Sequence, residues 1–218
     1  LIEAFVTPAN SMAPTLLGKH ITGTCPRCGA DAFGSPHELD SHALHEKDGL
    51  ILLICSRELQ SCQVDHVKPD VAAGDRFLVN KQLVPQRWDM VAFRFPADPT
   101  ILYVKRLVGL PGEEVVIRDG GVWIDGERLA MPEPIGGLRY VSELGDGFDG
   151  PLWGSPERPA KLGQDEYFVL GDFSQRSSDS RAWREGAPGQ PSYALPKANL
   201  VGVVTHIYWP PGRQRTFK

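Results

Sequence analysis

Short apolar runs separated by turn residues make up most of this 218-residue chain. Runs rich in β-branched and aromatic side chains predict strands, and no segment shows a long apolar period of 3.6 residues. The pattern therefore predicts a mainly β fold rather than a helical bundle. The predicted strands cover residues 75–79, 90–95, 101–108, 115–117, 122–124, 167–170 and 200–209.

Turn residues support this prediction. Gly and Pro, with 23 and 19 residues, make up about a fifth of the chain, above their usual share. Asp119-Gly120 lies between two predicted strands, a strong signal for a tight hairpin. Two stretches interrupt the strand pattern. Residues 24–66 hold all four cysteines, and residues 132–163 are rich in Gly and Pro and predict a long loop.

Charge and hydropathy narrow the function classes. The formal net charge of −4 argues against a protein that mainly neutralises nucleic-acid phosphates, so we expect no nucleic-acid partner. The sequence has no run of the ~18 apolar residues that a membrane-spanning helix needs. The chain begins at Leu1 rather than Met, so we expect a leader or anchor upstream of it.

Ser11 and Lys105 are the first candidate catalytic residues. Pro14 disfavours the α conformation at Ala13, so the Ser11 hydroxyl is presented from a turn. In the run 101–108 a period of two places Lys105 on an apolar face, where burial would lower its pKa and make it a base. The alternatives without a catalytic role are that Ser11 is an ordinary exposed serine and that Lys105 extends to solvent at a strand edge.

A third cluster of polar residues follows the strand at 167–170. Residues 171–181 carry small hydroxyl and carboxylate side chains, which on their own predict only a turn. The functional interpretation places a serine hydroxyl beside the lysine amine, with Asp179 and Arg181 holding the loop by a charge-assisted bond.

Together these segments resemble the type I signal peptidases, the membrane-bound serine-lysine endopeptidases. Four motifs carry the resemblance, in the family's order. They are residues 11–16, residues 74–81 with 88–94, residues 103–113, and residues 171–172 with 177–181.

The resemblance implies a coiled antiparallel β-sheet catalytic domain, with roles for five residues. Ser11 would be the nucleophile and Lys105 the general base. Ser177 would orient the lysine amine, while Asp179 and Arg181 would brace the loop. No cofactor is implied for catalysis.

The implied substrates are the N-terminal signal peptides of exported preproteins, cut after small residues at Ala-X-Ala sites. The family holds its substrate as an added β-strand, with shallow apolar pockets that exclude large side chains. It is anchored in a membrane with its catalytic domain on the extracytoplasmic (periplasmic) side. The residues that match the family's pocket lining are Pro8, Met12, Leu16, Tyr103 and Val104.

Three positions depart from the family pattern. Ala9 stands where the family often has a serine whose hydroxyl helps form the oxyanion hole. Phe173 and Arg176 replace residues that are usually Asn. These departures motivate an alternative, a non-catalytic binding scaffold with the Cys-rich insert as its interaction module. A self-cleaving repressor protease is disfavoured, since no DNA-binding helical pattern precedes Ser11.

The Cys-rich insert, residues 24–66, separates the first two motifs, which the family keeps almost contiguous. It divides the catalytic domain into residues 1–23 and 67–218. Cys25-Pro26-Arg27-Cys28-Gly29 has zinc-knuckle spacing. We expect a zinc-ribbon-like module with one structural Zn²⁺ held by thiolates. The four expected ligands are Cys25, Cys28, Cys55 and Cys62.

Two other uses of these cysteines stay open. Two disulfides would suit an oxidising extracytoplasmic space. A mixed metal site would include His66, four residues beyond Cys62. The remaining histidines of the insert lie in a polar stretch and are expected to be solvated. They are His37, His42 and His45.

Overall fold

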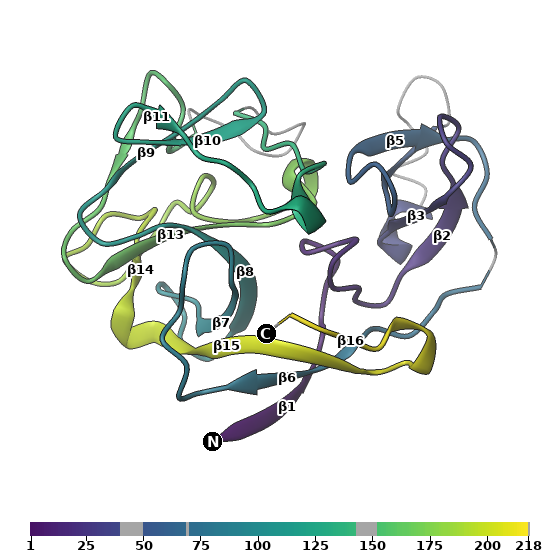
Figure 1. The fold of residues 1–218 in the computed structure, drawn as a ribbon, viewed down its shortest axis with the longest axis horizontal. Helices are drawn as coiled ribbons and strands as arrows, with labels where there is room; N and C mark the ends of the chain where they lie inside the picture. Colours follow the sequence, from purple (N-terminus) through teal and green to yellow (C-terminus); the bar gives the residue numbers. More distant parts are fainter. Residues whose placement is uncertain (40–49, 69, 143–151, 218) are drawn as a thin grey trace.

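A computed structural model describes residues 1–39, 50–68, 70–142 and 152–217 of the chain. Its strands form three antiparallel sheets (Figure 1). The predicted mainly β fold is confirmed, and short 3₁₀ turns are the helical elements among the described residues. Those turns are η1 Pro36–Leu39, η3 Glu133–Ile135, η4 Ser174–Arg176, η5 Lys197–Asn199 and η6 Pro211–Arg213.

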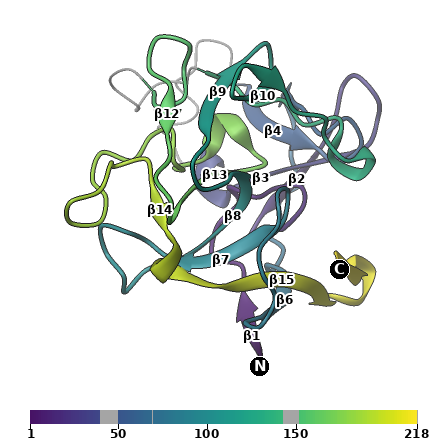
Figure 2. The ribbon, with the colours of Figure 1, turned by 60° about the vertical axis from the view of Figure 1, so that its left-hand side comes forward.

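The largest sheet has eight strands in the order β1-β6-β15-β7-β8-β13-β14, with β16 paired to β15. Figure 2 shows β1, β6, β15, β7 and β8 following one another across the molecule. The bounds are β1 Ile2–Val6, β6 Arg76–Asn80, β7 Met90–Arg94, β8 Leu102–Gly109, β13 Glu166–Leu170, β14 Leu195–Pro196, β15 Leu200–Trp209 and β16 Arg215–Thr216.

The second sheet contains the predicted hairpin. Its order is β11-β10-β9-β12, and Asp119 and Gly120 both have positive φ, 53° and 72°, as the tight hairpin turn requires. The bounds are β9 Glu114–Arg118, β10 Gly121–Ile124, β11 Glu127–Arg128 and β12 Ala160–Lys161.

The third sheet is built from the Cys-rich insert, in the order β2-β3-β4-β5. It begins at Ile21, and bridges from Gly23 to Val67 and from His20 to Ala72 extend it beyond residues 24–66. Figure 1 shows this unit beside the β9–β10 sheet, above β15. The bounds are β2 Ile21–Thr24, β3 Asp31–Gly34, β4 Ile51–Cys55 and β5 Ser61–Val64.

Separate apolar clusters hold the sheets together. Met12 and Leu16, from the segment after β1, pack against the large sheet at Phe77 and Val79. The described part of residues 132–163 contains the turn η3 and the short strand β12, joined by irregular segments. Its buried apolar side chains share one cluster with those of the second sheet, and they are Ile135, Leu138, Tyr140, Ala160 and Leu162.

No helix within the described ranges is long and apolar enough to cross a membrane.

Candidate active site

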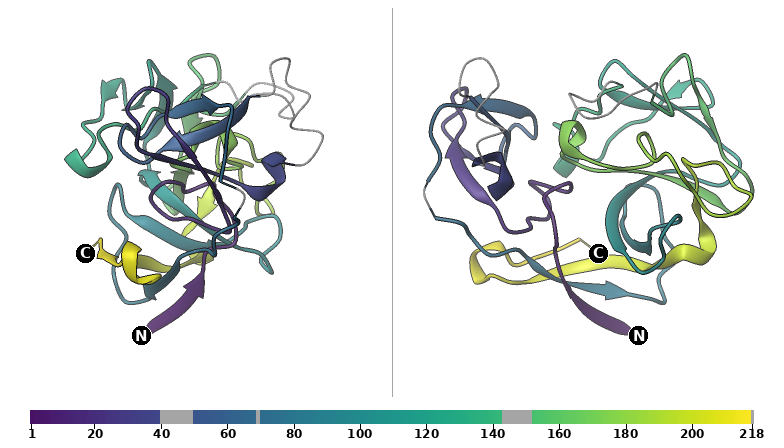
Figure 3. Two further views of the ribbon diagram at one scale, coloured as in Figure 1. Left: turned by 90° about the vertical axis from the view of Figure 1, so that its right-hand side faces the viewer. Right: turned by 180° about the vertical axis from the view of Figure 1, so that it is seen from behind.

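The segment that follows β1 carries Ser11 into the centre of the molecule. Seen from behind, it runs between the Cys-rich unit and strands β7 and β8 (Figure 3). Buried Met12 and Leu17 anchor it, and the backbone N–H of Leu17 donates to Asp75 Oδ2 at 2.8 Å. These contacts fix a short turn from which the Ser11 side chain reaches β8.

Ser11 and Lys105 meet in this arrangement. The distance from Lys105 Nζ to Ser11 Oγ is 2.5 Å, although the residues are 94 positions apart. Lys105 is 4% exposed, so the alternative of a lysine extended into solvent does not describe it. Burial lowers its pKa from 10.5 to about 8, while Asp179 and Asp172 oppose the shift. A lysine with this pKa is largely able to lose its proton in mildly alkaline water, as a general base must.

A groove of about 390 Å³ opens at this pair. Pro8, Met12, Tyr103 and Val104 line it, as expected from the sequence. Leu16 does not; it is fully buried in the core behind the groove. Residues that sequence reasoning did not assign to the groove also line it. They are Thr7, Ala9, Asn10, Ser35, His37, Leu102, Phe173, Arg176 and Ser178.

One edge of β8 is open along the groove. Residues 102–106 pair with β7 on one side, whereas β13 pairs with β8 only from Arg106 onward. Residues 102–105 therefore have no strand on their second side among those described. An open edge of this kind can accept an extended peptide as an added strand.

Two ion pairs hold the loop after β13. Arg181 Nη2 lies 2.7 Å from Asp179 Oδ2, and both side chains are completely buried. Arg106 forms a bidentate ion pair with Asp172, in which Nε donates to Oδ1 at 2.7 Å and Nη2 donates to Oδ2 at 2.5 Å. The strand alternation predicted that Arg106 points away from Lys105, but nothing in the sequence pattern named Asp172 as its partner.

Ser177 lies close to Ser11 but makes no hydrogen bond to Ser11 or Lys105 within the described structure. Its Oγ is buried and has no hydrogen-bond partner within the described structure. Gly171 makes the close approach possible, because a Cβ there would lie 2.1 Å from Ser177 Oγ and 2.5 Å from the Ser11 carbonyl oxygen. A buried hydroxyl without a partner carries a free-energy cost, which a functional role for Ser177 would explain.

The departures from the family pattern have distinct positions. Ala9 lines the groove, and the Ser11 N–H donates to no residue that the structure describes. Phe173 is buried, and its N–H donates to the Ser11 carbonyl at 3.0 Å. Arg176 lines the groove, yet Arg181 is the cation that acts to lower the pKa of Lys105.

The cysteines form a second candidate centre. Cys25, Cys28 and Cys55 place their sulfur atoms within 4.8 Å of one another, with 3.4 Å between Cys28 Sγ and Cys55 Sγ. Gly29 has a φ of +72°, and its N–H donates to the Cys25 carbonyl at 2.9 Å, which closes the knuckle turn.

The donor set fits Zn²⁺. Four thiolates around Zn²⁺ at ~2.3 Å would place sulfurs about 3.8 Å apart, close to the spacing of the three clustered thiols. Cys62 lies outside that trio but near it: burial raises the pKa of its thiol to about 12, and the Cys25 and Cys55 thiols add to the shift. All four cysteines, each within the described chain, are free thiols in this structure.

The histidines are spread out. His66 is exposed, its Nδ1 interacts with the Asp65 carbonyl, and it is absent from the cysteine cluster. His37 is exposed and also lines the groove. His42 and His45 lie outside the described residues.

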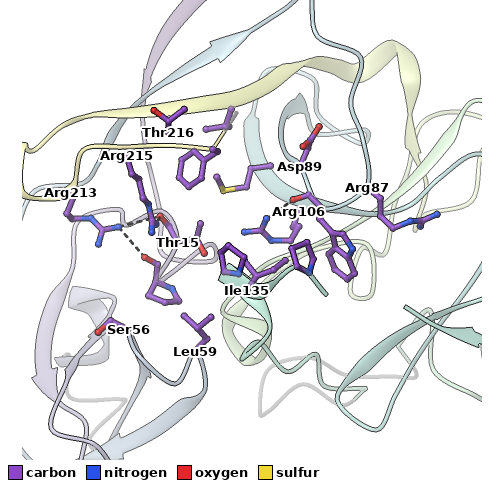
Figure 4. A pocket seen from close by; sticks show the side chains of 17 residues that line it. Thr15, Ser56, Leu59, Arg87, Asp89, Arg106, Ile135, Arg213, Arg215 and Thr216 are labelled. Carbon is purple, nitrogen blue, oxygen red and sulfur yellow. Dashed lines mark hydrogen bonds between the residues drawn. The ribbon is translucent and has the colours of Figure 1, made fainter. Parts of the chain in front are cut away.

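A larger cavity of about 510 Å³ lies away from this pair (Figure 4). Arginines line it, and they already have partners: Arg213 contacts Asp75 at 2.7 Å, and Arg215 donates to the Thr15 carbonyl. Neither Ser11 nor Lys105 reaches it. The smaller groove is therefore the candidate active site.

Comparisons with known proteins identify the family of this chain. The family model for signal peptidase, peptidase S26, matches residues 48–209. A signal peptidase I of Pseudomonas fluorescens is 30% identical over 179 residues, covering 66% of this chain and 62% of that protein. Signal peptidase I T of Bacillus subtilis is 33% identical over 117 residues, covering 52% of this chain and 58% of that protein.

A crystal structure of a signal peptidase I from Enterococcus faecalis covers 56% of this chain and 98% of its own, with 30% identity and a TM-score of 0.41. The chain spans less than two thirds of the length of the Pseudomonas relative. Ser11 precedes the residues that the family model matches, so its place in the site comes from the geometry. The match over most of the chain shows that this protein belongs to the signal peptidase family, peptidase S26.

Proposed function

We propose that this protein is an endopeptidase that removes N-terminal signal peptides from exported preproteins with a Ser11–Lys105 dyad. The observation that carries the proposal is the 2.5 Å contact between Lys105 Nζ and Ser11 Oγ at the open edge of β8. Family membership supports the substrate class.

The mechanism follows from the positions of the two side chains. Neutral Lys105 accepts the Ser11 hydroxyl proton while Oγ attacks the scissile carbonyl carbon. When the tetrahedral intermediate collapses, the ammonium returns that proton to the leaving amine. Lys105 then deprotonates a water that hydrolyses the acyl-enzyme, and Ser11 is restored.

The Ser11 N–H is the oxyanion donor that the geometry supports. This N–H belongs to the nucleophilic residue itself and donates a hydrogen bond to no group that the structure describes. Donors of this kind stabilise the charge that develops in the transition state. Ala9 has no hydroxyl, so its side chain supplies no second donor to the oxyanion.

The substrate would bind as a strand along residues 102–105. Backbone pairing with β8 supplies affinity, and alternate substrate side chains face the groove. Met12, Tyr103 and Val104 give that groove an apolar lining, which supports selection of small residues at the −1 and −3 positions, as in Ala-X-Ala sites.

The insert and the location complete the proposal. Residues 1–23 and 67–218 form the catalytic domain, and residues 24–66 form a zinc-ribbon-like module with one structural Zn²⁺. The chain acts at a membrane, on its extracytoplasmic side, where signal peptides of exported preproteins are cut. Family membership supports this location.

Cleavage of a preprotein with an Ala-X-Ala site tests the proposal. We expect wild type to cut it, and Ser11→Ala and Lys105→Met to lose that cleavage. Lys161→Met is the matched control, because Lys161 is an exposed lysine on a strand of the second sheet and pairs with Glu114. It should cleave like wild type.

Two results would contradict the proposal. Equal activity in Lys105→Met would defeat the dyad. A wild-type chain that binds the preprotein without cutting it, at any pH from 6 to 10, would instead favour the non-catalytic scaffold.

A further inference from the structure

The Cys-rich unit reaches the catalytic groove directly. Ser35 and His37, which follow its strand β3, line the same groove as Ser11 and Lys105. The insert is therefore not an appendage on the far side of the molecule, and Figure 3 shows the nucleophile segment passing next to it.

Asn10 joins the insert to the nucleophile segment. This residue is 4% exposed and immediately precedes Ser11. Its Nδ2 donates to the carbonyl of Lys19 at 2.6 Å and to Ser35 Oγ at 3.2 Å. Its Oδ1 accepts the N–H of Gly18 at 2.9 Å. The buried side-chain amide of Asn10 thus links both ends of the turn that carries Ser11, residues 10–19, to the end of β3.

An apolar contact provides a second connection. Phe173, the residue that departs from the family pattern, packs in one buried cluster with Leu17 and with Ile54 of β4. Its N–H also donates to the Ser11 carbonyl at 3.0 Å. Ile54 directly precedes Cys55, one of the three clustered thiols. The position of the Ser11 backbone is therefore linked through Phe173 to the cysteine centre.

We propose that the Cys-rich unit, the sheet of strands β2–β5 with its loops, forms one side of the active site and is needed for its activity. The unit positions Ser11 through Asn10 and Phe173, and it places His37 beside the bound substrate. Zn²⁺ bound at the cysteines holds the unit in the conformation that makes these contacts. The proposal rests on the proposed peptidase function. Asn10 and Phe173 are positioning residues, and His37 is a specificity-determining residue of the groove.

The consequence is that metal occupancy sets the rate of cleavage. Without Zn²⁺ the cysteine centre loosens, and Ile54 and Ser35 no longer hold the nucleophile turn. A displacement of about 1 Å at a reacting group can reduce the rate on the order of 10²-fold. We expect the larger effect in kcat, because the substrate edge of β8 belongs to the large sheet and stays in place, whereas the displacement of His37 raises KM.

The test uses the full chain loaded with Zn²⁺ and measures two readouts. The first is kcat and KM on an Ala-X-Ala preprotein. The second is hydrogen exchange at the Gly18 and Phe173 amides, which does not depend on activity. Removal of Zn²⁺ by a chelator should lower kcat about tenfold or more and speed exchange at both amides, and added Zn²⁺ should restore both readouts.

Variants separate the contacts. Asn10→Ala should lower kcat at nearly constant KM even with Zn²⁺ bound, whereas His37→Ala should raise KM at nearly constant kcat. Asn199→Ala is the matched control, because Asn199 Nδ2 donates to the carbonyl of Arg94 at an exposed site. It should match wild type.

Unchanged kcat and unchanged amide exchange after Zn²⁺ removal would overturn the proposal, with no variant needed. Unchanged kinetics in Asn10→Ala and His37→Ala would overturn it as well. Failure of the wild-type chain to cleave any preprotein would instead refute the proposed function. Hydrogen exchange at the Gly18 and Phe173 amides, with and without Zn²⁺, would then show whether the metal centre holds the Ser11 turn.

Discussion

Asp179 and Arg181 form a completely buried ion pair whose charges both act on the Lys105 amine, with Arg181 Nη2 2.7 Å from Asp179 Oδ2. The other oxygen of Asp179 accepts Arg181 Nε at 2.9 Å. Arg181 also donates to the carbonyls of Val141 and Ser174. The pair thus fixes the loop that carries Ser177.

Asp179→Ala should destabilise the protein strongly. It leaves a buried guanidinium without its counter-charge, which typically costs about 3–5 kcal/mol. Urea unfolding followed by tryptophan fluorescence measures the effect. Asp31→Ala is the control, because Asp31 pairs with Lys68 at an exposed site and such pairs contribute about 1 kcal/mol or less. Equal losses in the two variants would contradict the bracing role of Asp179.

Ser177→Ala should separate stability from activity. The Ser177 hydroxyl has no partner within the described structure, so its removal should leave the free energy of unfolding unchanged or slightly higher. If it orients the Lys105 amine during the reaction, kcat should fall about tenfold, the equivalent of ~1.4 kcal/mol. Thermal unfolding and kcat measured on the same preparation give both values. A variant with wild-type kcat would remove Ser177 from the site.

Lys105→Met should stabilise the protein at neutral pH. Burial lowers the folded-state pKa of Lys105 to about 8 from the model-peptide value of 10.5. The unfolded chain therefore binds more protons than the folded chain between these values, and stability rises with pH across that window. The destabilising contribution is fully present below pH 8 and is lost above pH 10.5. Methionine at this position has no such contribution.

The measurement is the difference in Tm between Lys105→Met and wild type at pH 7 and at pH 10. We expect a positive difference at pH 7 that shrinks at pH 10. A difference that is the same at both pH values would mean that the amine of Lys105 has an ordinary pKa.

Metal analysis tests the cysteine centre. Protein purified without added zinc should contain one Zn²⁺ per chain, and Cys25→Ser should lose most of it because Cys25 belongs to the clustered trio. A thiol assay after denaturation with a chelator should then find four free cysteines. Protein with no metal and no free thiols would indicate two disulfides instead.

Much of the fold could be predicted because its signals are local. Strand β15 covers residues 200–209 as expected, and the Asp119-Gly120 turn was visible as a dipeptide. The period of two predicts that Lys105 lies on an apolar face. Its burial, however, depends on contacts with neighbouring strands and with the loop after β13, and no local sequence pattern encodes these contacts.

The remainder of the site depends on contacts between distant segments. Asn10 is 25 residues from Ser35, and neither residue belongs to a periodic pattern that would pair them. Phe173 looked like a departure from the family, yet it fills an apolar space against Ile54. Leu16 was expected in the substrate pocket because of its motif, but in the structure its side chain faces the core.

The pH profile of kcat/KM tests the central claim most directly, since a neutral Lys105 is the proposed base. With the pKa of Lys105 lowered to about 8 by burial, cleavage of an Ala-X-Ala preprotein should rise from acid pH with an apparent pKa near 8 and then level off. That value would lie well below the ~10.4 of an unperturbed lysine. A profile that stays flat down to pH 5 would contradict the account.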